Sequence, residues 1–251
     1  MLRLEDLFQY QDEALLSNRS TAKVGVLLGF TREFVGVVMD TLESLEFTDP
    51  AKQTVIRVLS VDATSSLVVA CRAGLWGNVP EATILTRTAL ETLTILMCVV
   101  EEGAFRAFAF EMRARLRRFS YEACQTRLGG HAKKISSLHG QLSDVGGHTT
   151  RNRLKFAEFK LEGLAHDRLG FAFDAEGAEI ALLLIPDSLQ HLAAILRTAY
   201  THEQRTYPVE ARLTELNGRY AQFLRECDSE GNMSDRNDSE SFEGKGNPEL
   251  Q

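Results

Sequence analysis

The chain has 251 residues, of which 44% are hydrophobic and 25% are charged, and its formal net charge is −7. This is enough apolar material to bury a full core, either as one large domain or as two small ones. The longest uncharged runs, such as Thr92–Val100, fall well short of the ~18 residues that a membrane span needs, which argues against a membrane protein.

The charge is distributed unevenly along the chain. Gly103–Lys160 holds twelve Lys or Arg against four acidic residues, whereas the tail Asp228–Gln251 holds seven acidic residues against two basic ones. A moderately basic segment in an otherwise acidic protein points to an anionic partner or to a solvated helix face.

Cysteine usage and the N-terminus indicate where the protein is found. The cysteines at 71, 98, 124 and 227 form no C-x-x-C pair and have no histidine at zinc-ligand spacing. The first residues, MLRLEDLFQYQDE, are charged and amphipathic, unlike a signal peptide. We therefore expect a soluble, reduced, cytoplasmic protein with no metal site and no cofactor.

Helical periodicity covers most of the chain, and proline and capping residues mark several helix starts. Thr48-Asp49-Pro50 offers a cap followed by proline in the first turn, and Pro80 and Pro208 occupy similar positions. The pattern predicts an all-α bundle of about seven to eight helices. They are expected near 4–17, 21–46, 50–75, 80–101, 104–128, 131–143, 187–205 and 209–226.

Two segments depart from this pattern. In residues 169–185, alternating apolar residues, an Asp-Ala-Glu-Gly sequence and a β-branched, leucine-rich run that stops at Pro186 predict a small β-hairpin insert. The competing interpretation is a loop followed by one turn of helix. Residues 228–251 are acidic and rich in Ser and Gly, so we expect a disordered tail after a single helical domain at 1–227.

The most apolar helix, expected near 80–101, contains Arg87 and Glu91 four residues apart. Apolar residues cover more than one of its faces, so we expect both charges to be buried and paired. Arg87 is either an anion clamp in a polar cleft or part of an internal bridge, for instance to Asp62. On the preceding helix, the spacing of Arg72 and Trp76 predicts stacking of guanidinium on indole.

A glycine break follows the expected helix 131–143, in the sequence HGQLSDVGGHTTRNR. His148 stands next to Thr149, which could cap a helix that begins at Arg151, and such an N-terminus can bind an anion. The alternative is a plain junction between two helices. We predict that Ser143 and His148 converge with Arg87 and Glu91 on one polar patch, because buried charges need partners.

The basic segment offers a second candidate site. Its cations predict phosphate binding, and the alternative is a solvated helix face. The candidate phosphate ligands are Arg113, Arg117, Lys133, Lys134, Arg151 and Arg153.

Residues Arg72–Leu96, the basic helix after them and the sequence LSDVGGHTT together resemble a group of bacterial helical proteins. These carry R-x-x-x-E on a buried helix, matched here by Arg87 and Glu91, and an S-x-x-x-x-H turn, matched by Ser143 and His148. The group is similar to HEPN-like helical bundles, many of which are dimeric ribonucleases or toxins of bacterial defence. The HEPN ribonuclease motif has four to six residues between Arg and His, whereas Arg127 and His131 here have three between them.

No common nucleotide-binding or hydrolase motif occurs in the sequence. Two classes of function that do not depend on such a motif stay open. The first is a defence-related protein that binds RNA or a nucleotide through the basic segment and the polar patch. The second is a non-catalytic interaction or dimerisation module. A continuous positive groove would favour the first class, and scattered cations beside an exposed apolar stripe would favour the second.

Overall fold

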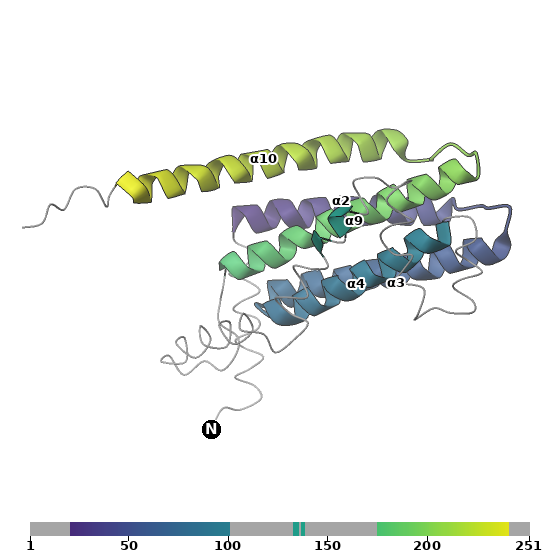
Figure 1. Cartoon of the computed structure of the whole chain (residues 1–251), viewed down its shortest axis with the longest axis horizontal. Helices are drawn as coiled ribbons and strands as arrows, with labels where there is room; N and C mark the ends of the chain where they lie inside the picture. Colours follow the sequence, from purple (N-terminus) through teal and green to yellow (C-terminus); the bar gives the residue numbers. More distant parts are fainter. Residues whose placement is uncertain (1–20, 101–132, 136, 139–174, 241–251) are drawn as a thin grey trace, which may run out of the picture. The chain divides into compact units, whose positions relative to one another are not determined.

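The computed structural model describes residues 21–100, 133–135, 137–138 and 175–240, with the backbone alone at 98, 175–178 and 228–240 (Figure 1). The described residues are almost entirely helical and contain no strand, which confirms the all-α class. The long helices are α2 (Ala22–Glu43), α3 (Pro50–Leu75), α4 (Val79–Val100), α9 (Ala175–His202) and α10 (Glu210–Glu240).

A sixth, short helical segment includes residues 133–135 and 137–138, so the described part holds six helices rather than seven to eight. The helices expected at 4–17 and 104–128 lie outside the described residues.

Capping and turn residues set the ends of α3. Asp49 Oδ1 accepts hydrogen bonds from the backbone N–H of Ala51 at 2.9 Å and of Lys52 at 3.3 Å, and Pro50 is the first helical residue. The helix ends at a tight turn in which Gly77 has a φ of 73°, a conformation that glycine adopts without a steric penalty. This turn brings α4 back along α3.

Four helices form the core. α9 packs against α2, α3 and α4, and α3 packs along α4, so α2 and α9 form one layer above the α3–α4 pair (Figure 1). The core is made of aliphatic and aromatic side chains from all four helices. Its largest fully buried members include Phe34, Ile56, Leu67, Leu90, Leu93, Leu96, Met97, Leu182 and Ile185.

The directions of these helices follow from contacts at one end of the bundle. Thr41, near the end of α2, bonds Tyr200, near the end of α9, and His202 Nδ1 lies 3.1 Å from the carbonyl oxygen of Val100, the last residue of α4. Lys52, in the first turn of α3, pairs with Glu203 at the same end. The C-terminal ends of α2, α4 and α9 therefore meet the N-terminal end of α3.

The chain divides into two compact units between Glu210 and Ala211. The second unit contains nearly all of α10. Within it, the rings of Tyr220 and Phe223 stack with their centroids 6.5 Å apart.

The predicted hairpin is wrong for residues 175–185, which form the first three turns of α9; residues 169–174 lie outside the described part. Leu182, Ile185 and Leu189 recur at the helical spacing and are all buried. Pro186 lies inside the helix instead of ending a strand. A proline there costs about 3 kcal/mol, and the buried apolar face of α9 offsets this cost.

The predicted disordered tail is not confirmed where the structure describes it. α10 continues through residues 228–240, and residues 241–251 lie outside the described part. No proline interrupts this stretch, and its single glycine, Gly231, costs only about 1 kcal/mol relative to alanine.

Candidate functional site

The Arg87–Glu91 pair is an ion pair on the surface of α4, so the prediction that it is buried is wrong. Arg87 Nε lies 3.1 Å from Glu91 Oε1, and the two side chains are 26% and 50% exposed. Their neighbours Thr86 and Leu90 are buried, because apolar and threonine side chains take the inner positions of α4. The pair therefore neither lines a buried cleft nor locks the core.

Asp62, which the alternative interpretation pairs with Arg87, is joined to a different residue of α4. Thr92 Oγ1 donates to Asp62 Oδ2 at 3.2 Å, and this bond links α3 to α4. Asp62 is exposed at the surface. This bond thus joins a buried threonine of α4 to an acidic side chain at the surface of α3.

Replacing Arg87 by alanine should lower the free energy of unfolding by only about 0.5 kcal/mol, because exposed pairs at i, i+4 contribute little. Urea denaturation would measure the free energy of unfolding of this variant and of Glu91→Ala, which should lose a similar amount because it breaks the same pair. A loss of about 3 kcal/mol or more, typical of a broken buried pair, would contradict the exposed geometry.

Most other predicted site residues lie outside the described part of the chain. Ser143 and His148 are among them, so their convergence with Arg87 stays a prediction. Of the six candidate phosphate ligands, only Lys133 and Lys134 are described, and both are exposed. The remaining four, outside the described residues, are Arg113, Arg117, Arg151 and Arg153.

The predicted stacking of Arg72 on Trp76 is confirmed. The guanidinium carbon of Arg72 lies 4.6 Å from the centre of the Trp76 ring, at the C-terminal end of α3. This contact fixes the Arg72 side chain near the turn into α4.

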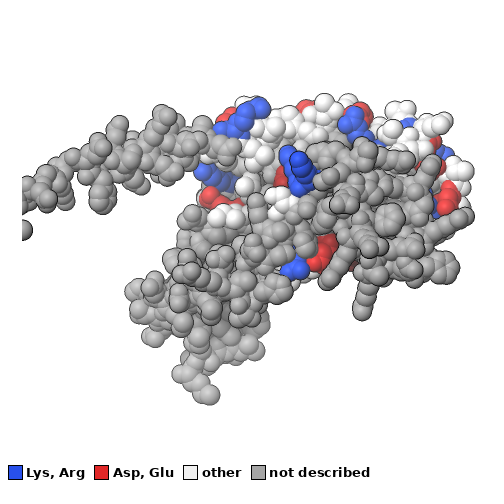
Figure 2. Space-filling model, viewed as in Figure 1, with Lys and Arg blue, Asp and Glu red and all other residues white. Residues whose placement is uncertain are grey.

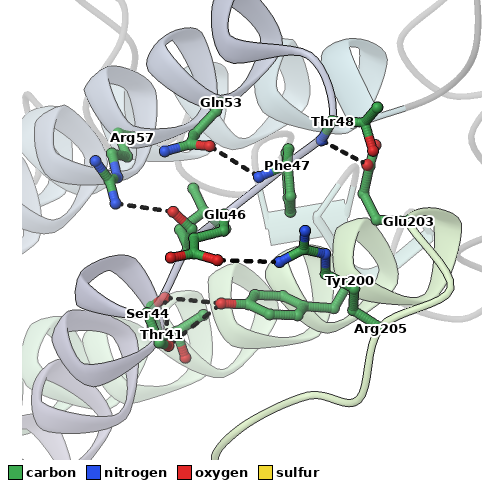
Figure 3. A network of polar contacts seen from close by, with 11 residues as sticks. Thr41, Ser44, Glu46, Phe47, Thr48, Gln53, Arg57, Tyr200, Glu203 and Arg205 are labelled. Atoms are coloured by element: carbon green, nitrogen blue, oxygen red, sulfur yellow. Dashed lines mark hydrogen bonds and ion pairs between the residues drawn. The ribbon is translucent and has the colours of Figure 1, made fainter.

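A network of hydroxyl groups that sequence reasoning missed joins α2 to the end of α9 (Figure 3). Tyr200 donates to the carbonyl oxygen of Thr41 at 3.2 Å. Thr41 Oγ1 donates to the carbonyl of Val37, so Tyr207, 3.0 Å away, must donate to that oxygen. Burial raises the pKa of Tyr207 to about 12. These residues are far apart in sequence, and no local pattern marked them.

The loop between α2 and α3 is held by a second set of polar contacts in the same region (Figure 3). Arg57 donates to the carbonyl oxygen of Leu45 at 2.8 Å. Glu203 accepts from the backbone N–H of Thr48 at 3.0 Å, and this bond is the main reason that the pKa of Glu203 is lowered. Each contact fixes a backbone group, so the network has a structural role.

A histidine in the core was also missed. His191 on α9 is fully buried, and its Nε2 lies 3.6 Å from Asp187 Oδ2 one turn earlier. The only signal in the sequence was the i, i+4 spacing of an acid and a histidine in an apolar helix. Among the described residues, no group of three or more His, Cys, Asp or Glu could hold a metal ion.

Four of the exposed large hydrophobic residues lie on α3. Val58, Val61, Val68 and Val69 are between 46% and 60% exposed, and together they form what we call the valine face. Ser65, also exposed, lies between them. Spacings of three, four and seven residues place these side chains on one side of the helix. Four exposed β-branched apolar residues on one side of a helix are unusual for a face that contacts only solvent.

The described charged residues visible in Figure 2 are interspersed rather than gathered. On the face shown in Figure 2, basic and acidic side chains lie close to one another among uncharged residues. Several cations are already paired with acids, including Arg197 with Glu210 at 2.6 Å and Arg205 with Glu46 at 3.4 Å. The described residues on this face therefore form no continuous positive groove.

Two described helices, α3 and the Glu179–His202 part of α9, are long and apolar enough by composition to cross a membrane. This is weak evidence, because the core helix of a soluble protein meets the same criterion. The Glu179–His202 helix is largely buried against its neighbours, and α3 carries the exposed charge of Asp62 within its apolar part.

Comparison of the chain with family models, with curated proteins and with solved structures finds no match in any of the three.

Proposed function

We propose that this protein is a non-catalytic helical interaction module and that the valine face of α3 is its contact surface. The single observation that carries the proposal is the exposure of four valines on one side of a helix whose opposite side is built into the core. Covering apolar surface is favourable by about 25 cal/mol per Å². A binding partner that covers this face therefore gains free energy without any change in the bundle.

The other polar features described above support the same proposal. The Arg87–Glu91 pair is a surface ion pair, and the hydroxyl network around Tyr200 fixes backbone groups. Neither arrangement brings a nucleophile and a base together at a position where a substrate could react. A module that acts by contact needs no such arrangement.

Photo-crosslinking tests the proposal whatever the identity of the partner. Benzoylphenylalanine at position 61, introduced in cells that express the full chain, should form a covalent adduct with a protein. The matched control carries the same group at position 26, since Val26 on α2 is 44% exposed and Val61 is 47% exposed. Equal labelling at both positions, or no adduct at either, would contradict the proposal.

A second candidate function is binding of RNA or a nucleotide in a defence system, and one observation favours it. Residues 103–160 carry twelve basic side chains, and the two of them that are described, Lys133 and Lys134, are exposed. If four or more phosphates are contacted, the logarithm of the binding constant should fall with the logarithm of the salt concentration at a slope of roughly −3. Filter binding of single-stranded RNA at two salt concentrations measures this slope. An absence of binding at low salt would contradict the second candidate and favour the interaction module.

A further inference from the structure

We infer that the partner of the valine face is a second copy of this chain, with the two α3 helices packed antiparallel around Ser65. This inference rests on the proposed function, because it identifies the occupant of the same surface. A two-fold interface uses the same patch on both subunits, so the patch must be complementary to itself.

The exposed residues of α3 meet this requirement. Val61 and Val69 lie four residues on either side of Ser65, and Val58 and Arg72 lie seven residues on either side. All of them are exposed on the same side of the helix as Ser65. In an antiparallel pair centred on Ser65, the region of Val61 therefore meets the region of Val68 and Val69 in the second copy, so apolar surface covers apolar surface at the centre, and Val58 meets the aliphatic part of Arg72 at each end.

The residue at the centre favours close approach. Ser65 has a small side chain and lies between the two pairs of valines, so the helix axes can come near each other where they cross. The valine face extends over about 17 Å of a helix that rises 1.5 Å per residue. An interface of this size is at the small end of specific interfaces, so we expect a weak, reversible dimer.

Charge selects the antiparallel direction over the parallel one. Asp62 and Arg72 are exposed at the border of the valine face. An antiparallel arrangement brings Asp62 of each copy toward Arg72 of the other, whereas a parallel arrangement in register sets Asp62 beside Asp62 and Arg72 beside Arg72. Like charges in an interface oppose association.

Engineered cysteines test both the contact and its direction. Under mild oxidation, Ser65→Cys should give a disulfide-linked dimer, since the two copies of residue 65 face each other. Thr54→Cys, on the same exposed side of α3, should give none. In the antiparallel pair its two copies are about 33 Å apart along the helices, and a disulfide requires Cα atoms within about 7 Å. The wild-type chain, oxidised in parallel, accounts for its native cysteines.

Sedimentation equilibrium provides the second measurement. Val61→Asp should raise the dimer dissociation constant at least tenfold, because it places a charge in apolar surroundings. The control Val26→Asp should leave this constant unchanged. Circular dichroism should show both variants folded, since both positions are exposed.

The outcomes separate this inference from the proposed function. A wild-type chain that is monomeric at every concentration, or equal crosslinking of Ser65→Cys and Thr54→Cys, would overturn the antiparallel dimer. If position 61 still crosslinks to another protein in cells, the interaction module stands with a different partner. If position 61 crosslinks to no protein at all, both the antiparallel dimer and the proposed function are wrong.

Discussion

Replacing Leu182 or Ile185 by alanine should lower the free energy of unfolding by about 2–5 kcal/mol in each case. Both side chains are fully buried on the face of α9 that packs on the other core helices. Each truncation removes apolar contacts and leaves a cavity that the surrounding helices fill only in part. Equilibrium unfolding in urea measures the two losses.

Ile180 provides the matched control, because it lies on the same helix and is 57% exposed. Ile180→Ala should change the free energy of unfolding by less than about 0.5 kcal/mol. In a β-strand, residues 182 and 185 would point to opposite faces, and only one of them would be buried. A large loss for one variant and a negligible loss for the other would therefore contradict the helix.

The second large effect concerns alkaline pH. The pKa of Tyr207 is about 12 in the folded chain, against an ordinary value near 10, and burial is the main cause. Because the folded state favours the neutral phenol, its contribution is fully present below about pH 10 and is lost as the pH rises toward about 12. Linkage puts the loss at about 2–3 kcal/mol.

Comparison with Tyr207→Phe isolates this contribution. At neutral pH the variant should lose about 1 kcal/mol, because the hydrogen bond between Tyr207 and Thr41 is absent. Between about pH 10 and 12 the wild-type chain should lose more stability than the variant, and the two curves should converge or cross. A difference between them that stays constant over this range would show that burial does not hold the phenol neutral.

The helical class and several helix ends could be predicted because they depend on local interactions. The cap at Asp49 and the proline after it fixed the start of α3, and the predicted range 50–75 equals the observed one. The stacking of Arg72 on Trp76 was predictable for the same reason, since residues four apart on a helix are neighbours.

The hairpin prediction failed because a short apolar run fits both a strand and a buried helix. Residues 180–185 contain no polar residue that would reveal an outer face of a helix, and Pro186 is a common stop signal. Tertiary packing decided the outcome, since α9 lies against three other helices and buries one side of the run, including Leu182 and Ile185.

The candidate site was less predictable than the fold. An apolar neighbourhood in sequence placed Arg87 and Glu91 in the core, yet their own spacing let them share one exposed strip of α4. The valine face and the hydroxyl network depend on which side of each helix meets its neighbours. One sequence does not contain that information, because each helix of this bundle has more than one apolar side.

The helix directions give the bundle an electrical polarity. A helix carries about half a positive charge at its N-terminus and half a negative charge at its C-terminus. At the end where α2, α4 and α9 finish and α3 begins, the macrodipoles sum to about one negative elementary charge. Arg57, which binds a carbonyl at the loop after α2, and Arg205, just beyond α9, supply positive charge there. The helix dipoles therefore favour cationic side chains at this end of the bundle, and added salt should screen this interaction.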